Sequence, residues 1–275
     1  MNTHIIEIDE SKERKLISKV KSIVIKIGTN VLVAQTGEPN KECIEKIAAD
    51  IAWLKNKGYA VLLVSSGAIG AGLKELGFKN RPTDICDLQT AAAVGQLKLI
   101  NLYNKYFAKL KCKISQVLLT HDDIKDKKRN LNAKNTILNL LKHNIIPIIN
   151  ENDVVANEEI KIGDNDVLSS MVCTLVGADL LIMLTTPDGL QKPSEVDATK
   201  TERICYLPKI DSNVFKYVGE KQNQFSTGGM ASKLHAASAA VDAGAYVVIA
   251  SGRQKSVIKN IIAGKSVGTL IGAKF

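Results

Sequence analysis

Short apolar runs alternate along the chain with longer segments of helical periodicity. The apolar runs predict strands at residues 22–27, 60–64, 114–119, 145–149, 179–184, 246–250 and 268–271. The periodic segments predict helices at residues 41–57, 88–110, 122–143, from 167 onward, from about 230 to 243 and at 257–262. A hairpin is predicted at 154–162, and a surface loop or small lid at 190–212. Because strands and helices alternate throughout, we predict one α/β domain: a doubly wound, mainly parallel sheet covered by helices on both faces.

Polar residues are concentrated after the strand predicted at 145–149. The run Asn150-Glu151-Asn152-Asp153 follows the strand directly, and Gly163-Asp164-Asn165-Asp166 opens the helix pattern at 167. Open α/β sheets bind ligands at the carboxyl ends of their strands, and acidic and amide groups suit an ammonium group, a magnesium ion or both. The structural alternative is that Asp164 or Asn165 only caps the helix and that the first run is only a turn.

Two lysines lie where they could bind phosphate. Lys26 interrupts the apolar run at 22–27, where burial is costly unless an anion meets the ammonium group. The alternative is that Lys26 reaches solvent at a sheet edge. Lys233 follows Thr227-Gly228-Gly229 at the start of a predicted helix, and the amino end of a helix attracts anions.

A run of small residues at 65–72 predicts a turn whose backbone amides can approach an anion closely. Neither a Walker loop nor a dinucleotide fingerprint is complete, because Lys259 and Glu75 stand where those motifs require glycine. The two lysines and the glycine-rich turns therefore predict phosphoryl-transfer chemistry without a Walker motif.

Composition narrows the classes of function. The chain has 275 residues, enough for one large domain, and its formal net charge of +9 favours anionic partners such as the phosphates of a small molecule or of nucleic acid. The 5 cysteines form no Cys-x-x-Cys pair, which argues against a zinc site or a disulfide framework and favours a reducing compartment. No apolar run has the length of a signal-peptide core or a membrane span, so we expect a cytoplasmic protein.

Five short motifs, taken together, form a recognisable pattern. They are Lys26-Ile27-Gly28-Thr29, Ser65-Ser66-Gly67-Ala68-Ile69, Asn150-Glu151-Asn152-Asp153, Gly163-Asp164-Asn165-Asp166 and Thr227-Gly228-Gly229-Met230 with Lys233. Together, over residues 22–270, they resemble the amino acid kinase family and, within it, the glutamate 5-kinases. The resemblance implies a three-layer αβα sandwich, usually a homo-oligomer, that phosphorylates the γ-carboxylate of L-glutamate with ATP and Mg²⁺. In that family this is the first step of proline synthesis, with L-proline as feedback inhibitor.

The resemblance also implies roles for individual residues. The family's catalytic positions fall on Lys26, Lys233, Asp164 and Asp166, and its glutamate-binding positions fall on Ser66, Asp153 and Asn165. Its ATP-binding positions fall on Lys26, Thr185, Thr186, Thr227, Gly228, Gly229, Met230, Ala231, Ser232 and Lys233, and no residue is assigned as a metal ligand. Charge considerations agree, because a carboxylate that attacks a triphosphate needs cations beside it. We expect Asp166 to hold both lysines and Asp153 to bind the substrate ammonium.

The chain departs from the family pattern at Thr186, where aspartate is common, and at Asn30, where serine is common. We expect an N-terminal extension at 1–21 and a kinase domain at 22–275, without the C-terminal PUA domain of many relatives and hence without a nucleic-acid partner. The competing interpretations are a uridylate or acetylglutamate kinase, a non-catalytic ligand sensor, or a basic nucleic-acid binder on the same fold. The run at 150–153 argues against the first, and the retained lysines and aspartates argue against a sensor.

Overall fold

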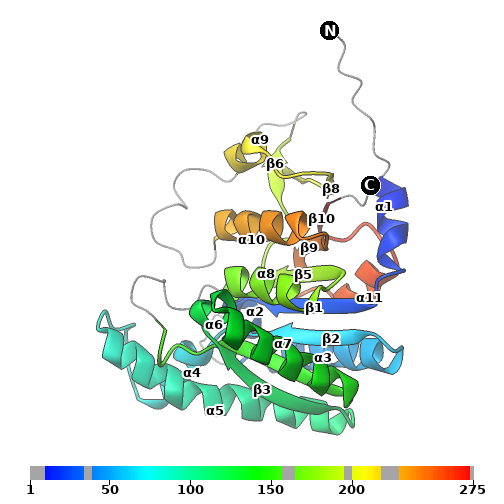
Figure 1. Ribbon diagram of the computed structural model, residues 1–275. Coiled ribbons are helices and arrows are strands. Elements are labelled where there is room, and N and C mark those ends of the chain that lie inside the picture. Colours follow the sequence, from blue (N-terminus) through cyan, green and yellow to red (C-terminus); the bar gives the residue numbers. More distant parts are fainter. Residues whose placement is uncertain (1–9, 34–38, 157–164, 195–199, 218–228, 273–275) are drawn as a thin grey trace.

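The computed structural model describes residues 10–33, 39–156, 165–194, 200–217 and 229–272 (Figure 1). Within these residues the main sheet has 8 strands, in the spatial order β3 (Lys113–Leu119), β4 (Ile145–Glu151), β2 (Ala60–Val64), β1 (Ser22–Ile27), β5 (Leu180–Thr185), β9 (Tyr246–Ser251), β10 (Thr269–Ile271) and β8 (Tyr206–Leu207). The strands from β3 to β9 in this order run parallel, β10 is antiparallel to β9, and β8 is parallel to β10. A separate antiparallel pair is formed by β6 (Gln191–Pro193) and β7 (Thr201–Arg203).

Helices cover both faces of the main sheet, so the predicted αβα arrangement is confirmed (Figure 1). One face carries α1 (Glu10–Ile17), α3 (Lys41–Asn56), α5 (Ile85–Lys109) and α11 (Val257–Ile262), and the other carries α7 (Lys127–Lys142), α8 (Asn165–Val176) and α10 (Met230–Asp242). The shorter helices are α2 (Thr29–Leu32), α4 (Ala68–Glu75), α6 (His121–Lys125) and α9 (Ser212–Lys216). Among the described helices, none combines the length and the apolar character needed to cross a membrane.

The alternation of side chains in β1 determines where Lys26 points. Ile25 packs in the core under α3 and α5, whereas Val24 packs in the core under α8 and α10. Successive side chains of a strand point to opposite faces, so Lys26 shares the face of Val24. Because β1 lies between β2 and β5, it has no open edge. The alternative that Lys26 reaches solvent is therefore wrong, and the residue is only 4% exposed.

The surface loop predicted at 190–212 is wrong, because this segment contains strands. β6 and β7 pair with each other, and β8 joins the main sheet by pairing with β10. These strands are only two or three residues long, too short for an alternating pattern to emerge from polar surroundings. The partner of β8, strand β10, also lies far along the chain, and local periodicity cannot reveal such a pairing.

The single helix predicted at 122–143 is in fact two helices that meet at Asp126. The backbone of Asp126 is extended, with φ −71° and ψ 123°, and its carboxylate accepts hydrogen bonds from the backbone N–H groups of Lys128 and Arg129. Aspartate competes for backbone amides in this way and so begins a new helix. Similarly, the turn predicted at 65–72 ends at Gly67, because Ala68 already begins α4. The predicted hairpin falls mainly on residues outside those described, and the other predicted elements are present with small shifts of their ends.

Helices α4 and α5 touch each other through their backbones. A Cβ atom on Gly72 would lie 1.7 Å from the carbonyl oxygen of Ala91, and one on Gly95 would lie 1.8 Å from that of Ala68. Only glycine permits this approach. The contact fixes the start of α4, and with it the turn that leads from β2 into this helix.

We predict that Gly95→Ala lowers the free energy of unfolding by about 1–3 kcal/mol, because the added methyl group forces α4 away from α5. Urea denaturation measures this change. Gly70→Ala is the matched control, since a Cβ atom on Gly70 meets nothing within 4 Å and alanine favours the helix. Equal stability losses in the two variants would contradict the importance of the backbone contact.

Candidate active site

Two buried lysines meet one buried aspartate on one face of the sheet. Lys26 donates from Nζ to Oδ1 of Asp166 at 2.5 Å, and Lys233 donates from Nζ to Oδ2 at 3.0 Å. The side chains of Lys26, Asp166 and Lys233 are 5%, 0% and 6% exposed. Charges so far from water are costly unless they are paired and hydrogen-bonded. Asp166 thus holds two ammonium groups side by side, as the sequence predicts.

Three elements from distant parts of the chain position this triad. Lys26 lies in the central strand β1, Asp166 lies in the first turn of α8, and Lys233 lies in the first turn of α10. Next to Lys26, Gly28 donates its backbone N–H to the carbonyl oxygen of Leu184 at 3.0 Å, which joins the carboxyl ends of β1 and β5. A Cβ atom on Gly28 would lie 3.9 Å from the Lys26 ammonium. The glycine therefore leaves room beside the ammonium group for an anion such as phosphate.

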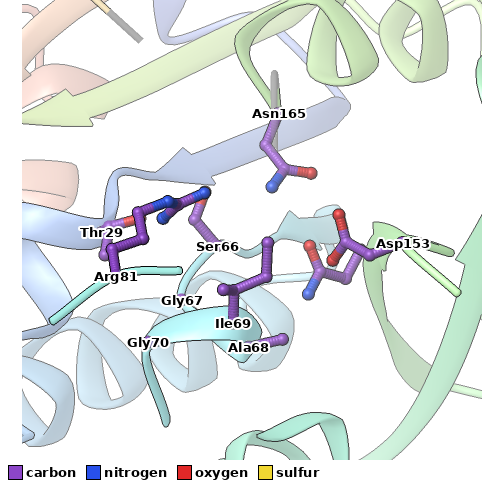
Figure 2. A pocket seen from close by; sticks show the side chains of 10 residues that line it. Thr29, Ser66, Gly67, Ala68, Ile69, Gly70, Arg81, Asp153 and Asn165 are labelled. Carbon is purple, nitrogen blue, oxygen red and sulfur yellow. The ribbon is translucent and has the colours of Figure 1, made fainter. Parts of the chain in front are cut away.

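A cavity of about 120 Å³ opens at the carboxyl ends of β1, β2 and β4 (Figure 2). The residues that the sequence predicts for glutamate binding, Ser66, Asp153 and Asn165, all line it. The other lining residues are Thr29, Gly67, Ala68, Ile69, Gly70, Arg81 and Asn150. In Figure 2, Asp153 and Arg81 approach the cavity from opposite sides. The fold therefore brings together polar groups from five separate segments of the chain.

Asp153 provides an acidic group at the cavity that lacks a hydrogen-bond donor. Its Oδ1 atom is buried and accepts no hydrogen bond within the described part of the chain, and the same holds for Oδ1 of Asn165. Burial raises the pKa of Asp153 to about 6, although the positive charge of Arg81 acts in the opposite direction. Buried oxygens without donors are costly. A ligand with an ammonium group would supply both the missing donors and a compensating charge.

Apart from Lys26, the described residues among the predicted ATP-binding positions lie at the end of β5 and at the amino end of α10, on the far side of β1 from the cavity. Thr185 ends β5 opposite Ser251 of β9, and Oγ of Ser251 donates to the carbonyl oxygen of Thr186 at 3.0 Å. The amino end of α10 supplies Gly229, Met230, Ala231, Ser232 and Lys233. Asp164, Thr227 and Gly228 lie outside the described residues. The triad around Asp166 thus separates a small cavity from a second strip of predicted binding residues.

Arg81, Thr29 and Asn150 also line the cavity, although no binding role was predicted for them from the sequence. Thr29 and Asn150 belong to motifs that the sequence contains, so their closeness in the chain to Lys26 and Asp153 could have indicated a place at the site. Arg81 lies in an exposed segment between α4 and α5 and belongs to no motif. Within the described residues, no three His, Cys, Asp or Glu side chains gather into a group that could hold a metal ion.

The αβα fold, the paired lysines and the adjoining cavity define a class of phosphoryl-transfer proteins. Residues 21–251 match the model of the amino acid kinase family, and the chain belongs to that family. Carbamate kinase from Giardia lamblia bound to AMP-PNP shares the fold, with a TM-score of 0.67, 19% sequence identity, and coverage of 94% of this chain and 100% of that chain.

Sequence similarity narrows the match within the family. The chain is 43% identical to glutamate 5-kinase of Lactiplantibacillus plantarum, over 94% of this chain and 98% of the relative. It is 42% identical to glutamate 5-kinase of Enterococcus faecalis, over 94% of this chain and 96% of the relative. The chain is therefore grouped with the glutamate 5-kinases.

The raised pKa of Asp153 predicts that the stability difference between the wild type and a variant without this carboxylate depends on pH. Between the ordinary aspartate pKa of about 3.9 and a pKa of about 6, the unfolded chain releases a proton that the folded chain retains, so stability falls as the pH rises. Asparagine cannot ionise. We therefore predict that, between pH 4 and pH 7, the free energy of unfolding of Asp153→Asn rises by about 2–3 kcal/mol relative to that of the wild type. Urea denaturation of the ligand-free proteins at several pH values measures it. A difference that does not vary with pH would contradict the raised pKa.

Proposed function

We propose that this protein transfers the γ-phosphoryl group of ATP to the γ-carboxylate of L-glutamate, forming L-glutamyl 5-phosphate in the first step of proline biosynthesis. The observation that carries the proposal is the pair of buried lysines held by Asp166 close to a cavity that contains Asp153. The similarity to glutamate 5-kinases over most of the chain supports the same substrate.

In the proposed reaction, a γ-carboxylate oxygen of glutamate attacks the γ-phosphorus of ATP, and the bond to the ADP oxygen breaks. Two anions must approach each other, so catalysis consists mainly of alignment and charge neutralisation. We assign neutralisation to Lys26 and Lys233, whose ammonium groups Asp166 holds in place. We assign binding of the substrate ammonium to Asp153, with Ser66 and Asn165 as further polar contacts. No general base is needed, because the attacking carboxylate is already ionised.

We assign the nucleotide to the strip formed by Thr185, Thr186 and the amino end of α10, with Thr227 and Gly228 added from the resemblance. Bound Mg²⁺ would neutralise phosphate charge and orient the phosphates for in-line transfer. Both Asp166 oxygens accept hydrogen bonds from lysines, so the described residues suit a Mg²⁺ ion that is held mainly by the phosphates of ATP. Asp164 remains a proposed catalytic carboxylate.

The resemblance supports further proposals about the whole protein. We propose a homo-oligomer in the cytoplasm, with residues 22–275 as its kinase domain and L-proline as a feedback inhibitor. Light scattering after size-exclusion chromatography measures the assembly, and titration of the kinase reaction with L-proline measures inhibition.

The direct test is incubation of the protein with ATP, Mg²⁺ and glutamate, with hydroxylamine present to trap the acyl phosphate. We expect a hydroxamate with glutamate and none with N-acetylglutamate, whose blocked amine cannot pair with Asp153. Failure to form the glutamate product, in a preparation that is shown to be folded, would overturn the proposed function.

We predict that Lys26→Ala and Lys233→Ala each lower kcat by roughly a hundredfold or more, the scale for loss of one electrostatic donor to the transition state. ADP release under saturating substrates measures the change. Lys46→Ala is the control, because Lys46 pairs with Glu42 on the surface of α3, away from the cavity. Wild-type turnover in either folded site variant would remove that lysine from the proposed mechanism.

A further inference from the structure

The cavity has a positive side as well as a negative one. Among the described residues that line it, Arg81 is the cation and Asp153 is the anion. Arg81 is exposed, and no hydrogen bond or ion pair joins it to the described part of the chain. It is nevertheless close enough to Asp153 to influence its charge state. Figure 2 shows the two side chains on opposite sides of the same space.

This polarity matches an α-amino acid end group. The α-carbon of an amino acid carries an ammonium group and a carboxylate, so the groups that recognise them must face one cavity. Asp153 offers a charge for the ammonium, and Arg81 offers a planar set of donors that fits a carboxylate with two parallel hydrogen bonds. The two lysines at Asp166 belong to a different, fully buried cluster and are needed beside the reacting γ-carboxylate. Among the described residues that line the cavity, this leaves Arg81 as the cation available to an α-carboxylate.

We propose that Arg81 binds the α-carboxylate of the acceptor and, together with Asp153, makes the enzyme select α-amino acids. This inference rests on the proposed function and assigns one part of the substrate to a residue outside the recognised motifs. Arg81 carries no described contact that must be broken before it binds. Because one side of the cavity is positive and the other negative, the pair also sets the direction in which the substrate enters, with its γ-carboxylate toward the lysines.

The test compares substrates that each lack one end group. 4-Aminobutyrate is glutamate without the α-carboxylate, and glutarate is glutamate without the α-ammonium. For Arg81→Gln we expect the KM for glutamate to rise roughly ten- to a hundredfold, the range for loss of a charge-assisted contact, with kcat nearly unchanged. The inhibition constant of 4-aminobutyrate should stay near the wild-type value. For Asp153→Asn we expect weaker binding of both glutamate and 4-aminobutyrate, but not of glutarate. Arg81→Lys should recover part of the loss.

Lys79→Gln serves as the matched control, because it removes a positive charge from the same exposed segment at a residue that does not line the cavity. An Arg81→Gln enzyme with wild-type KM for glutamate would overturn the inference while leaving the proposed function intact. A fall in kcat at unchanged KM would also overturn it, because Arg81 would then act on the phosphoryl group. Absence of glutamate phosphorylation by the wild-type enzyme is a separate outcome that refutes the proposed function. Calorimetric titration with glutamate in the absence of ATP then still tests Arg81, and equal affinity of wild type and Arg81→Gln would overturn the inference.

Discussion

The buried carboxylate of Asp166 is the constraint on which the site depends. It binds Lys26, which lies 140 positions earlier in the chain, and Lys233, which lies 67 positions later. Two ammonium groups repel each other and resist removal from water, so they can be held close together in the interior only when an anion lies between them. The same positive charge that makes the cluster costly is what a phosphoryl transfer between two anions requires. Stability therefore disfavours the two buried positive charges that the chemistry requires, and the Asp166 carboxylate compensates for both of them.

The sheet determines what surrounds this cluster. Because β1 is central, its carboxyl end has β2 and β4 on one side and β5 and β9 on the other. The cavity with Asp153 lies on the first side, and Thr185 and Thr186, at the carboxyl end of β5, lie on the second. Parallel strands place all these residues at one edge, so two substrates can approach the lysines from opposite sides. The close contact of α4 with α5 then fixes the wall of the cavity that Gly67 and Ala68 form.

Local charge, rather than overall charge, is the basis of the selectivity that we propose for the cavity. The chain is strongly basic, with a formal net charge of +9, which attracts anions in general. Within the cavity, however, one aspartate faces one arginine, and burial leaves Asp153 with a pKa of about 6. A zwitterionic end group would neutralise both residues at once. A simple anion would satisfy only Arg81, so the pair distinguishes ligands that the net charge cannot.

The sequence by itself determined the strands of the main sheet other than β8, most of the helices and the αβα layers, because apolar periodicity records which face of each element is buried. It also predicted Lys26, Ser66, Asp153, Asn165 and Asp166 as site residues, because they occur in motifs that resemble those of the glutamate 5-kinases. The resemblance led us to expect Asp166 beside Lys26, but only the tertiary structure gave the reason, since the contact depends on the position of β1 in the sheet and on the face to which the Lys26 side chain points. Only the tertiary structure revealed that β8 belongs to the main sheet and that Arg81 faces Asp153. Pairings between residues distant in the chain follow from strand order and packing, and a local sequence pattern contains neither.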